Sequence, residues 1–155
     1  MKINDFMITD VISVQKNITI KELLRTLVTN RIGGVPVVGE NNRLSGMISD
    51  GDVIRYLQPH GRTIYDALSI VFVNEKENLK QKVVSRIEDH AEKIMKKNIY
   101  TVLPDDDIEE ALSIFSRYHF KKVPVVDDDS AVVGVISRGD IIRLISNQMI
   151  ARAED

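Results

Sequence analysis

The sequence has no cysteine and no tryptophan, and aromatic residues make up 5% of its 155 positions. Without thiols, a disulfide framework and every thiolate-ligated metal site are excluded. No stretch reaches the roughly 18 uninterrupted apolar residues that a membrane helix needs, and the first residues lack the apolar run of a signal peptide. We therefore expect a cytoplasmic protein that does not bind a membrane.

The motifs of the common enzyme classes are missing as well. The three histidines, His60, His90 and His119, are widely separated and show no metal-ligand spacing. There is no Gly-x-Ser-x-Gly elbow, no Walker loop and no Gly-x-Gly-x-x-Gly fingerprint. The aspartate runs at 105–107 and 127–129 are explained by a helix start and a turn. The sequence thus predicts a protein that is not an enzyme, with no catalytic residue, metal site or catalytic cofactor.

The charge of the chain is nearly balanced. Its 21 basic and 23 acidic residues give a formal net charge of −2, and the two signs are interspersed. A protein that follows a nucleic-acid backbone needs a concentrated basic face, so direct binding to nucleic acid is not predicted. With 43% hydrophobic residues the composition is that of a folded globular protein.

The most informative feature is an internal repeat with an offset of 88 residues. Between positions 35 and 55, 11 of 21 residues are identical to those at 123–143. Met7 matches Met95 and Val14 matches Val102, so each unit is about fifty residues long. A unit of that size is too small to be stable alone. We expect the two copies to cover each other's apolar faces in one pseudo-twofold body.

Each unit predicts the order strand, helix, strand, strand, helix. Short β-branched or aromatic runs at 11–14 and 99–103 indicate the first strands. Thr19 and Asp107 are expected to be helix N-caps, each with a glutamate three residues later, and Gly33-Gly34 is expected to end the first helix through a left-handed residue. Two hairpins and two final helices complete the prediction, at 35–38 with 44–49, 123–126 with 132–137, 51–57, and 139–151.

The two units are separated by a connector. Its segments 63–73 and 77–90 have the composition and apolar spacing of helices that pack on the core or on another subunit. The predicted organisation is therefore a first repeat at 1–58, a helical connector at 59–92 and a second repeat at 93–155. The predicted fold class is α+β, with two tandem β-α-β-β-α repeats packed with pseudo-twofold symmetry.

The duplicated pattern of an apolar-Pro-Val-Val strand, followed by Gly-x-Ile-Ser-x-Gly-Asp, resembles the CBS domain, named for cystathionine β-synthase. Two such domains form a Bateman module. The resemblance implies two clefts between the repeats that bind AMP, ADP, ATP or S-adenosylmethionine. It also implies a homodimer that regulates an associated protein, here of unknown identity.

In the family's Ser/Thr-x-x-Asp motif the carboxylate takes the ribose hydroxyls and the hydroxyl residue lies near the phosphates. The resemblance gives these roles to Asp52 with Ser49 and to Asp140 with Ser137. Backbone groups near the start of each repeat and near each Pro-Val-Val strand would line the adenine slots. The expected ligand-binding residues are Ile12, Gly34, Val35, Pro36, Ser49, Asp52, Tyr100, Thr101, Lys121, Lys122, Val123, Pro124, Ser137, Arg138 and Asp140.

Elementary chemistry agrees with this assignment but leaves an alternative. An ionised aspartate accepts hydrogen bonds from two vicinal hydroxyls, and a helix N-terminus favours phosphate. Ser-x-x-Asp before an apolar run is also a helix-capping pattern. A ligand-sensing module is therefore our main hypothesis, and a ligand-free structural or dimerisation module is the alternative.

The two expected clefts differ in charge. Arg138 stands where the first motif has Asp50, and His119, Lys121 and Lys122 precede the second Pro-Val-Val strand. We therefore expect the Asp140 cleft to bind the charged nucleotide, and the Asp52 cleft to be empty or to take a less anionic ligand. The alternative is that these basic residues are surface side chains with solvated tips.

Overall fold

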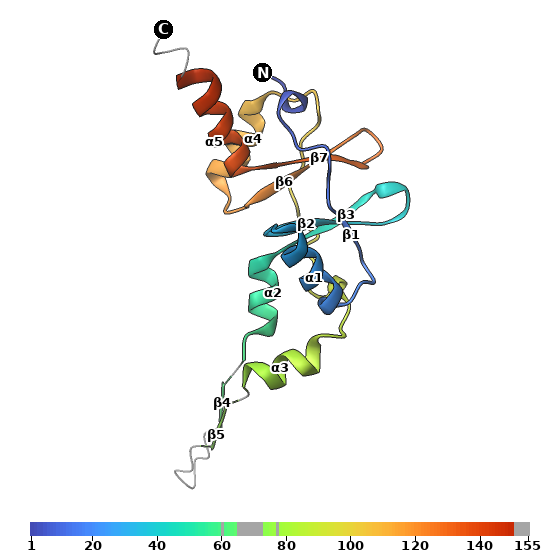
Figure 1. The fold of residues 1–155 in the computed structure, drawn as a ribbon, viewed down its shortest axis with the longest axis vertical. Coiled ribbons are helices and arrows are strands. Elements are labelled where there is room, and N and C mark those ends of the chain that lie inside the picture. The colour runs from blue at the N-terminus through green and yellow to red at the C-terminus, as the bar shows by residue number, and fades with distance from the viewer. Residues whose placement is uncertain (60, 65–72, 77, 151–155) are drawn as a thin grey trace.

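The computed structural model describes residues 1–59, 61–64, 73–76 and 78–150, and it confirms the α+β architecture of two tandem repeats (Figure 1). The elements of the first repeat are β1 (Val14–Gln15), α1 (Ile20–Asn30), β2 (Gly34–Val38), β3 (Leu44–Ser49) and α2 (Asp50–Leu57). Those of the second are α4 (Ile108–Arg117), β6 (Lys122–Val126), β7 (Val132–Ser137) and α5 (Arg138–Leu144). The helical path of α5 continues over Ile145–Ile150.

The hairpins of the two sheets have the same strand pairing at equivalent positions of the two repeats. β2 pairs antiparallel with β3, with Val35 opposite Ile48, and β6 pairs in the same way with β7, with Val123 opposite Ile136. β1 joins the first sheet in parallel, but only its residue Val14 falls in the strand expected at 11–14. The strand expected at 99–103 is wrong, because this segment contributes a single bridge from Val102 to Val125.

The helix caps differ between the repeats. Thr19 is the N-cap of α1, and its hydroxyl accepts the amide hydrogen of Glu22 at 3.2 Å while the Glu22 carboxylate accepts that of Thr19 at 2.8 Å. Asp107 also stands at an N-cap, but its side chain makes no cap bond. It forms an ion pair with Lys2 at 2.8 Å instead. Only the first of the two expected side-chain caps is therefore confirmed.

This difference predicts unequal effects of two alanine substitutions. Thr19→Ala should lower the free energy of unfolding by about 1 kcal/mol, because it leaves an amide of the first helical turn without its acceptor. Asp107→Ala removes only an exposed ion pair and should leave the free energy of unfolding nearly unchanged. Urea denaturation of both variants measures the difference, and equal losses would contradict the assignment of the caps.

The end of α1 corrects a further expectation. The left-handed residue is Arg31, with φ 52° and ψ 43°, and none of the described glycines has a positive φ. The Arg31 amide donates to the carbonyls of Leu27 and Val28, so the helix closes before Gly33 is reached. A Cβ at Gly34 would lie 3.2 Å from the carbonyl oxygen of Ile48, and the equivalent position of the second repeat accommodates Lys122.

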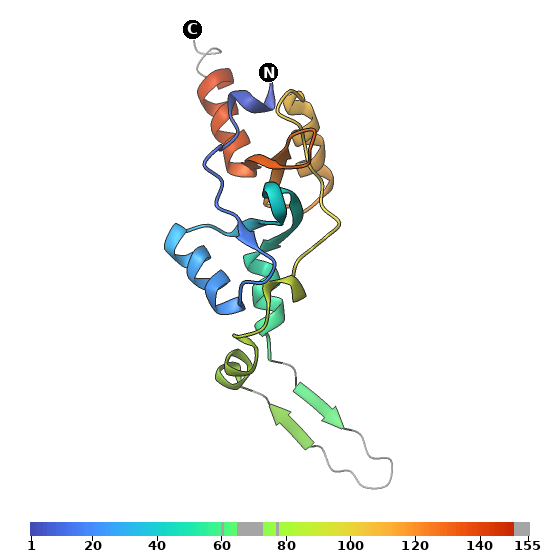
Figure 2. The same cartoon turned by 90° about the vertical axis from the view of Figure 1, so that its right-hand side faces the viewer.

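The connector departs from its prediction in one half. Strands β4 (Gly61–Ile64) and β5 (Val73–Lys76) pair antiparallel and project away from the body, as Figures 1 and 2 show. The helix expected at 63–73 is therefore wrong at both of its ends, and 65–72 lie outside the described residues. Helix α3 (Leu79–Arg86) confirms a helix within 77–90. Tyr56 on α2 connects α2 to this end of the connector. Its hydroxyl donates a hydrogen bond to the Asp89 carboxylate, and the Arg86 guanidinium lies over its ring.

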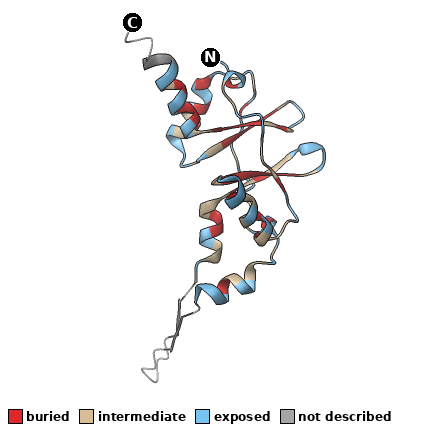
Figure 3. Cartoon of the chain, viewed as in Figure 1, coloured by how far each residue is buried: buried red, intermediate tan, exposed pale blue. Residues whose placement is uncertain are grey.

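The two repeats exchange their leading segments, which are residues 3–8 in the first repeat and 91–96 in the second. Ile3 is fully buried in the core of the second repeat, and Ala91 is fully buried in the core of the first. Two mutual backbone pairs, Ile8 with Val135 and Met47 with Lys96, fix the exchange, and they are related by the offset of 88 residues. Each repeat therefore completes the core of the other, and the burial in Figure 3 is concentrated on the strands between them.

The hairpin ends of the two repeats also touch. The Asn42 side-chain amide donates to the carbonyl of Val132 at 2.6 Å, and the Leu44 amide donates to that of Ser130 at 2.9 Å. A third apolar cluster, formed by Val38, Val126 and Val132, closes this end. These contacts hold the two sheets together at one end, so the pseudo-twofold packing expected from the repeat is present in the structure.

Candidate functional site

The first motif places a buried carboxylate at the start of α2. The Asp52 Oδ2 atom accepts the Ser49 amide at 2.8 Å and the Ser49 hydroxyl at 2.7 Å. Its Oδ1 atom contacts Arg55 Nη2 at 2.6 Å and Lys96 Nζ at 3.3 Å. Burial opposes ionisation, but the hydrogen bonds from Ser49 and Arg55 outweigh it, so the pKa of Asp52 lies below its ordinary value. Asp52 is therefore held as an anion.

The second motif repeats this arrangement with one difference. The Asp140 Oδ2 atom accepts the Ser137 amide at 2.8 Å and the Ser137 hydroxyl at 2.6 Å, and Arg143 pairs with Oδ1. At the position equivalent to Lys96 the other leading segment has Ile8. Both aspartates thus cap their own helices, as the capping alternative predicts, and Asp52 carries an additional cation.

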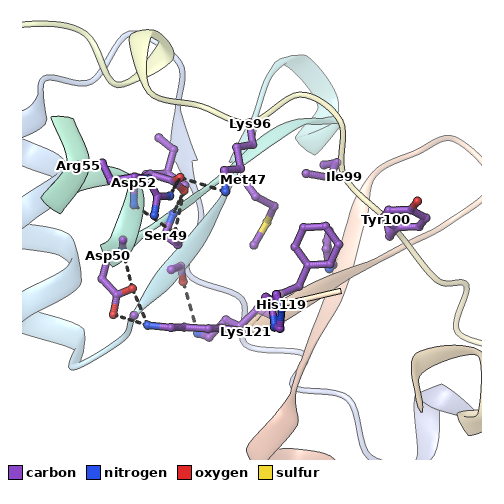
Figure 4. A pocket seen from close by; sticks show the side chains of 17 residues that line it. Met47, Ser49, Asp50, Asp52, Arg55, Lys96, Ile99, Tyr100, His119 and Lys121 are labelled. Atoms are coloured by element: carbon purple, nitrogen blue, oxygen red, sulfur yellow. Dashed lines mark hydrogen bonds and ion pairs between the residues drawn. The ribbon is translucent and has the colours of Figure 1, made fainter. Parts of the chain in front are cut away.

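A cavity of about 270 Å³ lies between the repeats and includes Asp52 (Figure 4). The first repeat contributes the starts of β2 and α2 and the end of β3, while the second contributes the segments around residues 96–100 and 119–124. The lining residues are Gly33, Gly34, Met47, Ile48, Ser49, Asp50, Gly51, Asp52, Arg55, Lys96, Ile99, Tyr100, His119, Phe120, Lys121, Lys122 and Pro124.

One wall of the cavity is apolar and aromatic. Tyr100 and Phe120 lie on it, with ring centroids 5.7 Å apart. Tyr118 stacks on Tyr100 from outside the lining, with centroids 4.4 Å apart, and the two hydroxyls are 2.6 Å apart. The Tyr100 hydroxyl donates this hydrogen bond to Tyr118, and because the bond needs its proton, the pKa of Tyr100 is raised. Such a wall accommodates a flat, weakly polar ring system.

The opposite side of the cavity is charged. Lys121 Nζ crosses from the second repeat to Asp50 on the first, at 2.8 and 3.1 Å from its two carboxylate oxygens. Lys122 Nζ lies 3.4 Å from the carbonyl oxygen of Gly34, and burial lowers the pKa of Lys122, partly offset by Asp140. The lining contains four lysine and arginine side chains and two carboxylates. The basic residues are Lys121, Lys122, Arg55 and Lys96, and the carboxylates are those of Asp50 and Asp52. An anionic group is therefore electrostatically favoured.

The structure brings only part of the expected site residues to this cavity. Those in the lining are Gly34, Ser49, Asp52, Tyr100, Lys121, Lys122 and Pro124. The others are outside it, namely Ile12, Val35, Pro36, Thr101, Val123, Ser137, Arg138 and Asp140. A second cavity, of about 230 Å³, is bounded by Asp140 together with Phe6, Arg143, Leu144 and Asn147.

The placement corrects the expected distribution of charge. His119 and Lys121, which we expected at the Asp140 cleft, lie on the Asp52 cavity, and Lys122 reaches it as well. The reason is that the start of β6 faces the start of β2 across the contact between the repeats, as the Lys122–Gly34 bond shows. Arg138 donates to the carbonyl of Tyr118 at 2.9 Å instead of entering the cavity.

Several lining residues were not expected from the sequence. Lys96, Ile99 and Met47 enter the site because the leading segment of the second repeat pairs with β3 of the first. The Met7–Met95 match shows that this segment belongs to the repeat unit, which was the available signal. Arg55 lies within the helix predicted at 51–57 and Phe120 shortly before the strand predicted at 123–126, but neither carries a motif of its own.

Residues 1–59, 61–64, 73–76 and 78–150 contain neither a membrane-spanning helix nor a cluster of metal ligands. None of the helices in these ranges is long and apolar enough to cross a membrane. No group of three or more histidine, cysteine, aspartate or glutamate side chains in the same ranges is arranged to hold a metal ion.

The fold and the cavity together define a tandem-repeat protein with a ligand-sized cleft shared between its halves. The family model for the CBS domain matches residues 3–59 and 91–147, so the chain belongs to the CBS domain family as a pair of CBS repeats. It is 32% identical over 134 residues to the chloroplastic CBS domain-containing protein CBSX1 of Arabidopsis thaliana, covering 84% of this chain and 57% of that protein.

Solved structures of CBS pairs have the same fold. The CBS domain pair of protein MJ0100, in complex with 5′-methylthioadenosine and S-adenosyl-L-methionine, is 25% identical with a TM-score of 0.70, over 94% of this chain and 99% of that one. CBSX2 in complex with AMP is 23% identical with a TM-score of 0.71, over 94% and 96%. The chain also matches parts of larger proteins, such as 24% of a homoserine O-acetyltransferase of Methanohalobium evestigatum.

Proposed function

We propose that this protein is a regulatory module that binds an adenine nucleotide, AMP in the first instance, in the cavity at Asp52. The observation that carries the proposal is one cavity that combines a buried aspartate anion, an apolar aromatic wall and an excess of basic side chains. Those three features match the ribose hydroxyls, the purine ring and the phosphate of a nucleotide.

Each part of the nucleotide has a partner in this arrangement. Asp52 accepts the ribose hydroxyls, and the adenine lies against Tyr100 and Phe120. The phosphate contacts Lys121 and the amide groups at the start of α2, where the helix dipole favours negative charge. This assignment moves the nucleotide from the Asp140 cleft to the Asp52 cavity. ADP, ATP and S-adenosylmethionine are the other ligands of this class.

The relatives support an adenosine-containing ligand. The CBS pair of MJ0100 is bound to 5′-methylthioadenosine and S-adenosyl-L-methionine, and CBSX2 is bound to AMP. The common part of these molecules is adenosine, which is the part that Asp52 and the aromatic wall would recognise. The basic side chains of this cavity favour the member of the group that carries a phosphate.

The module would act by conformational change in the cytoplasm, as a homodimer that regulates a partner protein and without catalysis of its own. A ligand that binds better to one arrangement of the repeats shifts the population toward it. Ile54 and Ile142 support a dimer, because these equivalent positions on α2 and α5 are 68% and 65% exposed.

A second candidate function is a ligand-free dimerisation module. It is favoured by the observation that Asp52 and Asp140 already have hydrogen-bond and ion-pair partners within the chain. Both carboxylates would then serve only to cap α2 and α5.

Thermal unfolding separates the two candidates. A ligand that binds only the folded state raises stability by RT ln(1 + [L]/Kd), or about 2.7 kcal/mol at a hundredfold excess over Kd. We expect AMP to raise the melting temperature progressively with concentration, by about 5–10 °C at that excess. Melting curves with AMP, ADP, ATP, 5′-methylthioadenosine and S-adenosylmethionine make the comparison. Curves unchanged by all five would leave the dimerisation module as the function.

A further inference from the structure

Asp50 occupies the place in the cavity where an anion would be bound. Its Oδ1 atom accepts the Gly51 amide at 2.7 Å and contacts Lys121 Nζ at 2.8 Å, and its Oδ2 atom lies 3.1 Å from the same ammonium group. Figure 4 shows the Lys121 side chain reaching across to Asp50. One backbone donor at the start of α2 and one cation from the other repeat therefore converge on a carboxylate of the protein itself.

The ion pair between Lys121 and Asp50 is exposed, so another anion can replace Asp50 in it. The side chain of Lys121 is 65% exposed and that of Asp50 is 42% exposed, so neither is locked in place by packing. The ammonium group of Lys121 holds the pKa of Asp50 below its ordinary value, so Asp50 is an anion at neutral pH. An exposed ion pair of this kind contributes little to stability, so a doubly charged phosphate can displace it.

The ion pair exists on one side of the molecule only. In the second repeat the position of Asp50 is occupied by Arg138, which donates to the carbonyl of Tyr118. The position of Lys121 is occupied by Gly33 in the first repeat. The repeat symmetry would therefore not produce this contact at the Asp140 motif, and the feature is specific to the Asp52 cavity.

We propose that Asp50 is an internal competitor of the ligand's phosphate, an autoinhibitory anion that engages Lys121 and the Gly51 amide until a nucleotide displaces it. This inference rests on the proposed function of the Asp52 cavity. Two consequences follow. The affinity for phosphate-bearing ligands is lower than the cavity would otherwise give, and binding breaks a contact that joins the two repeats.

The direction in which Asp50→Asn changes the affinity for AMP tests the competition. Asp50→Asn keeps the size of the side chain and an oxygen for the Gly51 amide, but it releases Lys121. We expect AMP to bind about fivefold more tightly to this variant, which corresponds to the upper end of the range for exposed ion pairs. Lys121→Met should weaken AMP binding by about tenfold, because the phosphate loses its cation. Binding of 5′-methylthioadenosine, which has no phosphate, should change less than twofold in both variants.

The chain offers a matched control in Asp107→Asn. It removes the same charge and an exposed ion pair of the same length, 2.8 Å to Lys2, at a site that does not line the cavity. Isothermal titration calorimetry at fixed ionic strength gives all the dissociation constants, and AMP affinity should be unchanged in this control.

The outcomes separate this inference from the function on which it rests. The competition is supported if AMP binds more tightly to Asp50→Asn but not to Asp107→Asn, and if the affinity for 5′-methylthioadenosine does not change. AMP binding that is unchanged or weaker in Asp50→Asn overturns the competition and leaves the nucleotide site intact. If the wild type and the variants all fail to bind AMP and 5′-methylthioadenosine, the nucleotide site and the competition are both wrong.

Discussion

Asp52→Asn is expected to weaken AMP binding by roughly 10- to 100-fold. A hydrogen bond to a charged group contributes about 1.5–3 kcal/mol, and each 1.4 kcal/mol is a tenfold change in the dissociation constant. The asparagine has nearly the same shape, but it offers one weaker acceptor oxygen in place of two anionic ones. The ribose hydroxyls would therefore lose their charged partner while the adenine wall stays in place.

The repeat supplies the control for this experiment. Asp140→Asn disrupts the same set of cap bonds from Ser137 and the same type of ion pair, so its effect on stability should resemble that of Asp52→Asn. Only Asp52 lines the cavity that contains Lys121. Calorimetric titration with AMP should show a near-normal affinity for Asp140→Asn. Equal losses in the two variants, or no loss in either, would refute the assignment of the nucleotide to the Asp52 cavity.

Local signals in the sequence predicted the parts of the fold that depend on neighbouring residues. The Pro-Val-Val runs and the turns after them gave both hairpins, and Ser-x-x-Asp gave the starts of α2 and α5 with their capping boxes. Such features depend on backbone propensity and on hydrogen bonds within three or four residues. The repeat then indicated that the two units pack as one body.

The position of the basic residues in the fold could not be predicted from such local signals. An alignment of the repeats pairs Lys121 with Gly33 and Lys122 with Gly34, which suggests that each belongs to the motif of its own repeat. In the folded chain these positions face each other across the contact between the repeats, so Lys121 reaches Asp50. Which side chain crosses that contact depends on the relative placement of two sheets, and no local pattern encodes it.

The connector and the end of α1 show two other limits of sequence patterns. An apolar run such as 63–73 is compatible with a helix or with strands, and only the partner segment decides between them. In the fold its two described ends pair with each other as β4 and β5. The left-handed residue after α1 fell on Arg31, although a glycine pair stood two residues further on, because the helix ended at Asn30.

The exchange of leading segments predicts a large loss of stability for Gly46→Ala. A Cβ at Gly46 would lie 2.6 Å from the carbonyl oxygen of Lys96 and even closer to Met95. Real Cβ atoms do not approach a backbone oxygen so closely, so the paired segment must move. The two hydrogen bonds between Met47 and Lys96 would be disturbed. Overpacking in a well-packed region costs about 1–3 kcal/mol, and we expect a value near 3 kcal/mol here.

Two further glycine variants calibrate this prediction. At Gly134 the nearest atom is the sulfur of Met7, 2.6 Å away, and the carbonyl oxygen of Ile8 is 3.3 Å away. A flexible thioether can move aside, so Gly134→Ala should cost about 1–2 kcal/mol. At Gly139, in α5, the nearest contact is 3.5 Å, and alanine should be neutral or stabilising by up to about 1 kcal/mol.

Urea denaturation of the three variants should therefore order them as Gly46→Ala, Gly134→Ala and Gly139→Ala, from the least to the most stable. Adding Met95→Ala to Gly46→Ala should restore only part of the loss, because the backbone oxygen of Lys96 remains in the way. Since Lys96 also contacts Asp52 in the cavity, the Gly46→Ala protein should bind AMP more weakly as well. If Gly46→Ala were as stable as Gly139→Ala, the close pairing of the second leading segment with β3 would be wrong.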